Sequence, residues 1–572
     1  MDRRFFLRSI GLGVATIPVL KPYAFGAGSR SRKNDKGKKL IAQLYRKHFP
    51  PKPKKKTPRS ATPNVLLITS DQQHFMGLGI NDPRLKTPNL DRLAKMGTVF
   101  DRAYTPNPTC TPSRASIITG QYPSQHGAWS LGTKLRDDSP TVGDEFRKAG
   151  YKTSLVGKAH FQPLRGNAEH PSAEAYPALQ DLDFWKSFDG PFYGFDHVEL
   201  TRNHGDEAHV GQHYALWLEK KGATNWRDWF RKPTGNSGPQ RGAWNMPGEY
   251  HMNAWIAERT NELMEEHQKK NEPFFMWASF FDPHPPYLVP EPWASMYDPD
   301  KLEPPMAVPG EHDDMPKQYG MTQRKGDKEA KKFFSQWNEK GGHHVFGYHT
   351  NHGLDEKKRR KNMAVYFGMI SMLDHYVGQI LDKLDELGIT ENTLVVYTTD
   401  HGHYFGQHGL DKKGNFGYED GVRIPFIVSK PGEIPQGKRT DSLQTLVDLA
   451  PTFLGFCGIE KPSFMTGVDM TSDWKKGGAQ TRDHVVVESR QQPTKLYLKT
   501  YIEKRYKIVT YSNHIGSDKP YGELFDLEKD PQELVNLWDK SEFQNLKAEM
   551  LLKQMQAEMK KEPTPMKRLS IA

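Results

Sequence analysis

The sequence predicts an α/β protein in which a large, mainly parallel sheet is sandwiched by helices and followed by a smaller C-terminal antiparallel-sheet subdomain. Three observations support this fold class. Short apolar runs alternate with segments of helical periodicity from residue 62 to about residue 480, as in a parallel sheet covered on both faces. After residue 480, short β-rich pieces follow one another between turns. The chain has 572 residues, of which 36% are hydrophobic, and this is ample for a large core.

The predicted strands of the main sheet are short apolar runs without polar alternation, as expected for strands that are buried on both faces. They lie at Asn64–Ser70, Thr153–Val156, Phe274–Ser279, Thr393–Thr398 and Pro425–Val428. Between these runs, apolar residues recur with helical spacing. The corresponding helices are expected at Thr87–Met96, Thr141–Ala149, Ala254–Gln268 and Met363–Leu387.

The smaller sheet is expected to be antiparallel because its strands are short and separated by turns. Its strands are predicted at Val485–Glu488, Leu496–Ile502, Tyr506–Tyr511 and Leu524–Asp526, with a closing helix near Ser541–Lys560. We therefore predict a large domain over residues 62–480 and a C-terminal subdomain over residues 481–572. Within the large domain, residues 163–250 and 300–360 are interpreted as insertions.

The first residues have the features of an export signal. Arg3 and Arg4 are adjacent, the apolar stretch Ser9–Leu20 follows, and the small residues of Ala24–Gly28 offer a cleavage site. This order predicts a twin-arginine-type signal peptide over residues 1–28, a periplasmic or secreted location and a twin-arginine translocase as partner; the alternative is a merely basic start. The apolar stretch is too short to span a bilayer, and no other apolar run reaches about 18 residues, so no stable membrane span is expected.

The net charge of +11 comes from one segment rather than from the whole chain. Residues 29–60 contain 13 Lys and Arg residues and a single acid, Asp35, so a basic, Lys/Pro-rich linker is predicted over residues 29–61. The alternative is a segment that clings to an anionic polymer or a membrane surface. No nucleic-acid-binding motif of interleaved aromatic and basic residues accompanies the segment, so nucleic acid is not an expected partner. The two cysteines, Cys110 and Cys457, exclude a disulfide framework.

Two predicted strands end in residues that are suited to a metal site. The first strand is followed by Asp71 and Gln72, and the strand at Thr393–Thr398 is followed closely by Asp400 and His401. Ligands in open parallel sheets collect at the carboxyl ends of the strands, which brings these distant residues together. A lone acid at a strand end is more often a cap or turn residue. The two ends together favour a hard divalent cation, Ca²⁺ or Mg²⁺.

Cys110 lies in an unusual frame of residues. The segment reads Thr109-Cys110-Thr111-Pro112-Ser113-Arg114, and Thr119-Gly120 follow. A lone cysteine is more often a small buried hydrophobe than a functional group. The pattern C-x-P-S-R-x-x-x-x-T-G, however, resembles the signature of the type I sulfatases of the alkaline phosphatase superfamily. The resemblance extends over roughly residues 62–540.

The resemblance implies a modified nucleophile and a reaction. A formylglycine-generating maturation enzyme would oxidise Cys110 to Cα-formylglycine (3-oxoalanine), an aldehyde whose hydrate is the nucleophile. The implied reaction is hydrolysis of a sulfate ester. One hydroxyl of the hydrate attacks sulfur and expels the alcohol, and the covalent sulfate half-ester then breaks down by elimination.

The resemblance also implies a set of metal ligands: Asp71, Gln72, the modified Cys110, Asp400 and His401. Two of these residues depart from the common family pattern, because many sulfatases have a second Asp at the position of Gln72 and Asn at the position of His401. Gln72 lowers the charge of the ligand set and His401 adds a nitrogen. Ca²⁺ is therefore the expected ion, with Mg²⁺ or Mn²⁺ as alternatives, and Gln72 is the least certain ligand.

Cationic residues that match the family's motifs are expected around the sulfate. Arg114 lies one helical turn after Cys110, so its guanidinium is expected to return to the nucleophile. Lys158 and His160 follow a predicted strand, and their i, i+2 spacing directs both side chains into one cleft if the segment is extended. His160 is the candidate for helping the elimination step.

Two further residues are assigned by the resemblance. Lys413 matches the family's catalytic lysine, and its distance from Tyr418 favours it over Lys412. His284 lies between two prolines, which restrict the backbone around it. It is the candidate for binding sulfate and for protonating the leaving alcohol. Taken singly, each lysine would be a solvated surface residue and a turn histidine would be inert.

A sulfated glycan or small sulfate ester is the expected substrate. Six tryptophans crowd one part of the chain and are either core residues or a platform for sugar rings: Trp217, Trp226, Trp229, Trp244, Trp255 and Trp277. Arg202 and the nearby histidines are candidates for shaping the pocket. The first alternative function is a phosphonate or phosphate monoester hydrolase of the same superfamily, which the pairs Asp71-Gln72 and Asp400-His401 also resemble. The second is a non-catalytic polyanion-binding protein, which only the basic segment supports.

Overall fold

The structure, a computed structural model, describes residues 62–562 except 168, 203–208, 231–240, 316–318, 320–348, 351–354, 492–495 and 513–520. The expected signal peptide and basic linker therefore lie outside the described residues, as do parts of both predicted insertions. Within the described part of the chain, no helix is both long enough and apolar enough to cross a membrane.

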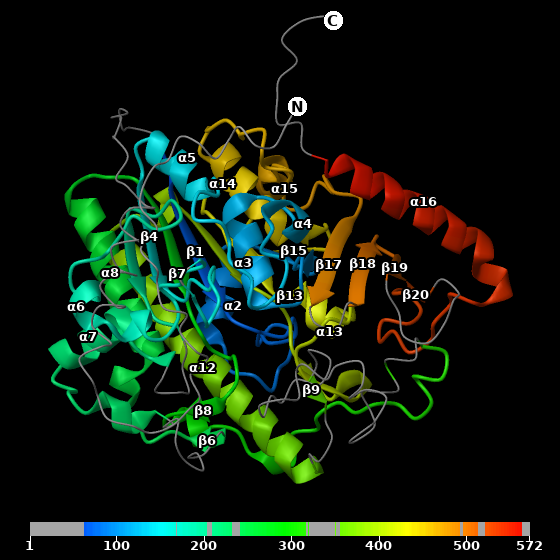
Figure 1. The fold of residues 1–572 in the computed structure, drawn as a ribbon, viewed down its shortest axis with the longest axis horizontal. Coiled ribbons are helices and arrows are strands. Elements are labelled where there is room, and N and C mark those ends of the chain that lie inside the picture. Colours follow the sequence, from blue (N-terminus) through cyan, green and yellow to red (C-terminus); the bar gives the residue numbers. More distant parts are fainter. Residues whose placement is uncertain are drawn as a thin grey trace, which may run out of the picture.

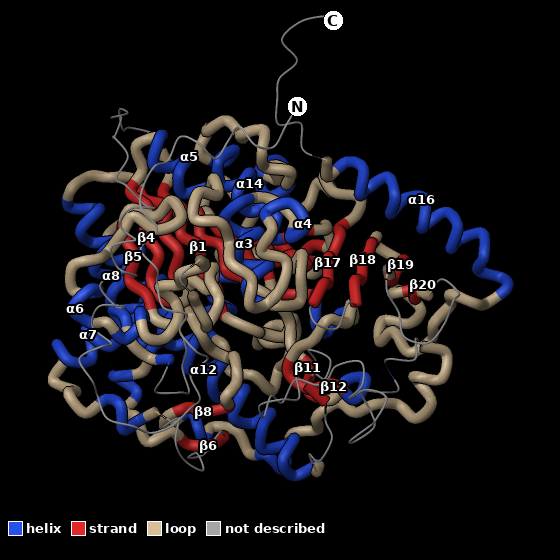
Figure 2. Tube along the Cα trace, viewed as in Figure 1, coloured by secondary structure: helices blue, strands red, loops and turns tan. Residues whose placement is uncertain are grey.

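An eight-stranded sheet forms the centre of the protein, with the strand order β15-β2-β14-β10-β1-β7-β4-β5 (Figures 1 and 2). Its strands are β1 (Asn64–Ser70), β2 (Thr98–Phe100), β4 (Lys152–Gly157), β5 (His197–Leu200), β7 (Phe274–Ser279), β10 (Thr393–Thr399), β14 (Phe426–Ser429) and β15 (Lys438–Thr440). β1 pairs in parallel with both β10 and β7. β14 runs antiparallel to both of its neighbours. The expected large, mainly parallel sheet is confirmed, with one reversed strand.

Helices cover both faces of this sheet, and successive residues of β1 face opposite layers. On one face, Leu66 and Ile68 pack with α2 (Pro88–Lys95), α7 (Gln212–Lys220), α8 (Met252–Lys269) and α12 (Glu356–Glu386). On the other face, Val65 and Leu67 pack with α3 (Cys110–Thr119), α5 (Val142–Lys148), α14 (Leu449–Phe456) and α15 (Thr471–Lys476). Every residue of β1 is buried, which explains why the sequence shows an unbroken apolar run.

The tryptophans belong to the interior. Five of the six are buried in the two clusters that line the faces of the main sheet: Trp217, Trp226, Trp244, Trp255 and Trp277. Trp229 is half-buried and packs against the same core. The core alternative therefore holds, and these residues do not form an exposed platform for sugars.

The C-terminal residues form the expected smaller antiparallel sheet, beside the main sheet in Figure 1. Its strands are β17 (Val485–Gln491), β18 (Leu496–Ile502), β19 (Tyr506–Tyr511) and β20 (Gly522–Asp526), and α16 (Gln544–Lys560) packs on it. Buried Glu488 ties this subdomain to the rest of the chain, because it accepts hydrogen bonds from the backbone N–H and hydroxyl of Ser124 at 2.7 and 2.8 Å. Glu488 also pairs with Lys499 at 2.6 Å and with Lys561 at 2.5 Å.

Shorter elements complete the described fold. Two small sheets are formed by β3 (Ala103–Tyr104), β13 (Arg423–Ile424) and β16 (Gln444–Thr445), and by β9 (His349–Thr350), β11 (Tyr404–Phe405) and β12 (Leu410–Lys412). β6 (Arg241–Ala243) pairs with β8 (Tyr287–Val289). The short helices are α4 (Pro123–His126), α6 (Leu182–Trp185) and α13 (Glu419–Val422).

Candidate active site

The carboxyl ends of two adjacent strands place two acids side by side. β1 and β10 pair in parallel, with Ser70 opposite Thr399, so Asp71 and Asp400 follow directly at neighbouring positions. Both acids are fully buried. The backbone N–H of Gln72 donates to Asp400 Oδ1 at 3.1 Å and thereby links the two strand ends. The meeting of strand ends expected from the sequence is present in the structure.

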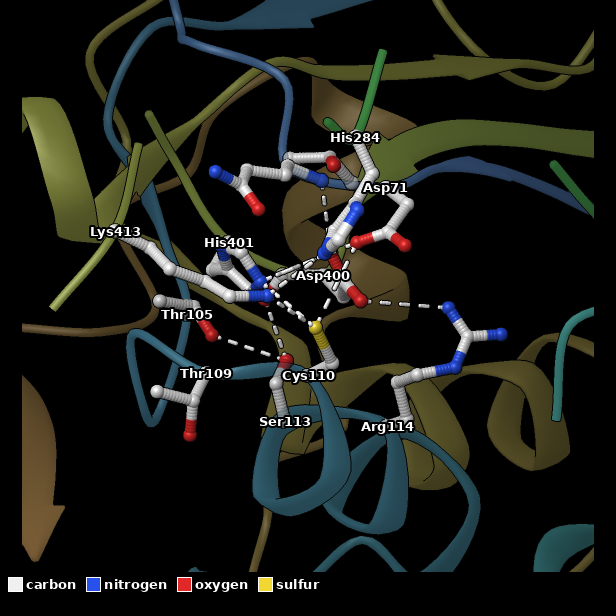
Figure 3. A network of polar contacts seen from close by, with 12 residues as sticks. Asp71, Thr105, Thr109, Cys110, Ser113, Arg114, His284, Asp400, His401 and Lys413 are labelled. Atoms are coloured by element: carbon white, nitrogen blue, oxygen red, sulfur yellow. Dashed lines mark hydrogen bonds and ion pairs between the residues drawn. The ribbon is translucent and has the colours of Figure 1, made fainter. Parts of the chain in front are cut away.

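Cys110 joins these acids from the opposite side. It is the first residue of α3, where the unpaired N–H groups and the helix dipole favour negative charge. Its Sγ lies 3.1 Å from His401 Nε2, 3.0 Å from Lys413 Nζ and 3.7 Å from Asp71 Oδ1 (Figure 3). Cys110 is fully buried. The side chains of Asp71, His401 and Lys413 therefore converge on one sulfur atom.

The donor atoms at this place fit a divalent cation. One ligand atom each from Asp71, Cys110, Asp400 and His401 lies within 4.8 Å of the others, and all four residues are buried. His401 Nδ1 is 3.0 Å from the carbonyl of Gly402, an arrangement in which Nδ1–H donates and Nε2 keeps its lone pair. The carboxylate oxygens suit a hard cation, and the imidazole nitrogen also suits a transition ion such as Mn²⁺.

The side-chain amide of Gln72 supports the same interpretation. Its Nε2 lies 2.9 Å from His403 Nδ1, whereas its Oε1 is buried and has no hydrogen-bond partner among the described residues. An unpaired buried amide oxygen is costly unless a ligand satisfies it. Gln72 is thus suited to cation binding, although the sequence marked it as the least certain ligand. Its φ of 64° is in the left-handed region, which is uncommon for a residue other than glycine.

Lys158 and Arg114 lie on the flank of the cluster. Lys158 Nζ pairs with Asp71 Oδ2. Arg114 is fully buried, with its guanidinium 4.7 Å from the ring of Trp277 and Nη1 3.5 Å from Asp400 Oδ2. No hydrogen bond between Arg114 and Cys110 is present in the described residues. The arginine expected at the nucleophile itself instead contacts a neighbouring carboxylate.

Lys413 and His284 form the opposite flank. Lys413 Nζ lies 3.0 Å from Cys110 Sγ and 3.0 Å from His284 Nε2 (Figure 3). His284 Nδ1 is 2.6 Å from the carbonyl of Pro285. Both side chains are only half-buried, so this flank faces the opening of the site. Lys413 therefore contacts Cys110, and its assignment as the catalytic lysine stays a prediction.

His160 lies near this group but is not bonded to Cys110 in the described part of the chain. Its side chain is half-buried, and its Nδ1 is buried without a partner there. Burial and the positive charges of Arg202 and Lys158 hold the pKa of His160 well below its usual range. The imidazole is therefore neutral at ordinary pH, and its unprotonated nitrogen can accept a hydrogen bond.

The electrostatic character of the site is cationic. Burial raises the pKa of the Cys110 thiol, but the positive charges of Lys158 and Lys413 outweigh this effect and lower the pKa overall. The same balance lowers the pKa of Asp71, against the effect of burial. A site with these properties stabilises negative charge at the Cys110 position.

Two residues that contact the site or its loops, His403 and Glu174, were not assigned roles from the sequence. His403 is fully buried and holds Gln72 through Nδ1, while its Nε2 lies 3.1 Å from the Tyr287 hydroxyl. Its position two residues after His401 was an available signal. Glu174 and Arg202 form a buried ion pair, with Arg202 Nη1 2.8 Å from Glu174 Oε2. No local pattern indicates Glu174.

The fold and the site define a hydrolase of the alkaline phosphatase-like class, with a buried cysteine beside cationic side chains and clustered acids at the carboxyl edge of a large sheet. The family model described as Sulfatase matches residues 63–459, and that described as N-sulphoglucosamine sulphohydrolase, C-terminal, matches residues 406–561. The chain therefore belongs to the sulfatase family, as its sequence motifs indicated, and is a sulfuric ester hydrolase that acts on sulfated substrates.

Individual relatives agree with this assignment. The chain is 29% identical over 510 residues to an arylsulfatase of Clostridium perfringens, covering 84% of this chain and 91% of the relative. It is 26% identical over 513 residues to an N-acetylglucosamine-6-O-sulfatase of Bacteroides thetaiotaomicron, covering 86% and 85%. A phosphonate monoester hydrolase of Agrobacterium radiobacter has a similar fold, with a TM-score of 0.69, 23% identity, and coverage of 88% and 97% of the two chains.

Proposed function

We propose that this sulfatase removes sulfate from a sulfated carbohydrate in the periplasm or outside the cell, using Cα-formylglycine made from Cys110 and a bound divalent cation. One observation carries the proposal: Cys110 Sγ lies 3.0 Å from Lys413 Nζ and 3.1 Å from His401 Nε2, beside two buried acids. A nucleophile at this position would lie beside the positive charge of Lys413 and beside carboxylate oxygens that can bind a cation.

The cation would be held by Asp71, Gln72, Asp400 and His401 together with the modified side chain at position 110. When bound, Ca²⁺, or alternatively Mg²⁺ or Mn²⁺, would polarise the S–O bonds of the ester and offset the charge of the nucleophile. The unpaired Oε1 of Gln72 and the four clustered ligand atoms support this assignment.

The modification would precede folding. Cys110 has no exposed surface, so a maturation enzyme needs the unfolded segment as its substrate. The twin-arginine pathway carries folded proteins, so a protein matured in the cytoplasm suits that route. Formylglycine would supply a hydrated aldehyde. One hydroxyl would attack sulfur, and loss of the proton from the second would expel the sulfate and restore the aldehyde.

Lys413 and His284 would together protonate the leaving alcohol. In a neutral imidazole with Nδ1–H donating to the carbonyl of Pro285, Nε2 of His284 accepts a hydrogen bond from Lys413 Nζ. The transferable proton is therefore held between Nζ and Nε2, rather than by His284 alone. Both groups are half-buried at the opening of the site, where a leaving alcohol departs.

Two further residues complete the proposed mechanism. Lys158, which pairs with Asp71, would neutralise charge on the sulfate oxygens. His160, kept neutral by burial and by the neighbouring positive charges, would take the proton of the second hydroxyl during elimination. Arg114 would orient Asp400 and the turn that carries Lys158.

Carbohydrate is the substrate class best supported by the relatives, which include the Bacteroides N-acetylglucosamine-6-O-sulfatase. The export proposal rests on Arg3 and Arg4 and on the apolar stretch after them. Replacing both arginines by lysine should keep the protein in the cytoplasm of a host that has twin-arginine transport. An unchanged periplasmic fraction would refute this route.

The reaction class is tested by matched substrates. Matured enzyme should hydrolyse an aryl sulfate faster than the corresponding phosphate monoester and phosphonate monoester, and a panel of desalted sulfated oligosaccharides should then identify the sugar. A clear preference for a phosphorus ester would favour the phosphonate hydrolase alternative. Deleting residues 29–60 should leave aryl sulfate turnover intact. If polyanion binding and all biological activity were lost together with residues 29–60, the polyanion-binding alternative would be favoured.

A further inference from the structure

The turn that follows β4 is tightly constrained. Gly157 has φ 111°, and a Cβ at this position would lie 2.0 Å from the carbonyl oxygen of Ser279, so only glycine fits. Three residues later, His160 has φ 58°, in the left-handed region that non-glycine residues seldom adopt. Such strain persists only where surrounding contacts hold it. The residues that hold His160 in place therefore bear directly on the site.

The buried carboxylate of Glu174 supplies those contacts. Its Oε2 accepts the backbone N–H of His160 at 2.8 Å, and its Oε1 accepts those of Phe161 and Gln162 at 2.9 and 3.1 Å. Three successive N–H groups thus converge on one carboxylate, an arrangement that binds anions well. Arg202 Nη1 donates to Oε2 at 2.8 Å and compensates the buried charge. Glu174 is 1% exposed and Arg202 is 5% exposed.

The other side of the same turn is held by the site itself. Arg114 donates to the carbonyl oxygens of Lys158 and Ala159, the latter at 2.8 Å from Nε. The carbonyl groups of the turn thus face an arginine that also contacts Asp400, while its N–H groups face Glu174. Between these two anchors lie Lys158, which pairs with Asp71, and His160.

We propose that Glu174 is a positioning residue that acts through His160: it fixes the strained backbone from which the imidazole is presented to the site, with Arg202 as its counter-charge. The inference rests on the proposed role of His160 as the base of the elimination step. It adds to that role a residue that touches neither substrate nor cation.

The contrasting explanation is that Glu174 is one more buried ion-pair partner that only stabilises the fold. The chain contains a matched control for that explanation. Asp448 is 2% exposed, pairs with buried Arg482, and accepts the backbone N–H of Val468 at 2.7 Å. It has no described contact with the site, so Asp448→Asn removes a comparable buried charge at a place remote from the chemistry.

The first experiment compares Glu174→Gln with Asp448→Asn in the matured enzyme, using an aryl sulfate. Because glutamine keeps the shape but replaces one acceptor oxygen by an NH₂ group, we expect kcat to fall about 30-fold with KM changed less than about threefold. Asp448→Asn should lower the Tm by a similar amount and leave kcat unchanged. Equal Tm losses with unchanged kcat in both variants would overturn the proposal.

The second experiment is a double-mutant cycle with His160→Ala. If Glu174 acts through His160, Glu174→Gln should cost less than about threefold in kcat when His160 is already absent. The same loss in both backgrounds would show a general structural effect and overturn the proposal. Should Glu174→Gln not accumulate as folded protein, Arg202→Met enters the same cycle with the same expected outcomes.

A readout that does not need turnover separates this inference from the proposed function. In protein labelled with ¹³C at histidine, the His160 signal is identified by its loss in His160→Ala. We expect Glu174→Gln to shift this signal and Asp448→Asn to leave it unmoved. An unmoved His160 signal in Glu174→Gln would refute the positioning role. If the signal shifts but wild-type enzyme turns over no sulfate ester, the proposed function fails while the positioning contact stands.

Discussion

Replacing Lys413 by methionine removes a side chain that contacts both Cys110 and His284. Its Nζ lies 3.0 Å from each partner, and methionine keeps most of the volume without the charge. A charge-assisted hydrogen bond contributes about 1.5–3 kcal/mol, so two such contacts in the lower part of that range give about 3–4 kcal/mol if they strengthen in the transition state. Because about 1.4 kcal/mol corresponds to tenfold in rate, kcat should fall about 10²–10³-fold.

The neighbouring lysine provides the matched control. Lys412 is the last residue of β12 and makes no described hydrogen bond to Cys110 or His284, so Lys412→Met should change kcat less than about threefold. The assay is initial-rate hydrolysis of a series of aryl sulfates that differ in leaving-group pKa. Since Lys413 and His284 are proposed to protonate the alcohol, the loss in Lys413→Met should grow as the leaving group becomes poorer.

Two results would refute this reasoning. Equal losses in Lys413→Met and Lys412→Met would mean that the contacts to Cys110 and His284 do not carry the effect. A loss in Lys413→Met that is independent of the leaving group would leave the lysine a role in binding sulfate but would exclude its role in proton transfer.

Three further predictions concern the cation, the turn after β4 and the C-terminal subdomain. Removing divalent ions with a chelator should abolish turnover and lower the Tm, and adding Ca²⁺ back should restore both; full activity after verified metal removal would exclude the cation. Gly157→Ala should lower the free energy of unfolding by more than about 2 kcal/mol, because the new Cβ would clash with the carbonyl oxygen of Ser279 and the φ of residue 157 is positive. A Tm within one degree of wild type would contradict this. Burial would raise the pKa of Glu488, but Lys561 and Lys499 outweigh it and hold the pKa at about 2. The stability that this depressed pKa confers is present above pH 4.5 and is lost as the pH falls toward 2. In Glu488→Gln, the free energy of unfolding should therefore depend less on pH in that window, by up to about 3 kcal/mol. An unchanged pH dependence, measured by denaturant titration at each pH, would refute the assignment.

The sequence predicted the strands well wherever a buried apolar run ended at a turn. Phe274–Ser279, Leu496–Ile502 and Tyr506–Tyr511 are observed with the predicted bounds. The run predicted at Pro425–Val428 is observed as β14 at Phe426–Ser429, but it runs antiparallel to its neighbours. Strand direction depends on the path of the connecting loops and leaves no mark on the local residue pattern.

The candidate site was predictable where motifs or strand ends mark it. Asp71 and Asp400 were expected together because parallel strands end at one edge, and Cys110 stood out by its frame of residues. Glu174 was not predictable, because its hydrogen bonds go to backbone N–H groups, which any residue offers. The unexpected position of Arg114, on Asp400 rather than on Cys110, depends on the placement of the turn at Lys158, which the sequence does not encode locally.

The most direct test of the account is the chemical state of Cys110 in active enzyme. The account predicts that the Cys110 peptide resists alkylation by iodoacetamide and is lighter than the thiol form, because sulfur and two hydrogens are lost and one oxygen is gained in the aldehyde. Cys457, which is a free thiol and partly exposed, is the alkylation control in the same digest. Fully active enzyme in which all of the Cys110 peptide is recovered as alkylated thiol would contradict the account.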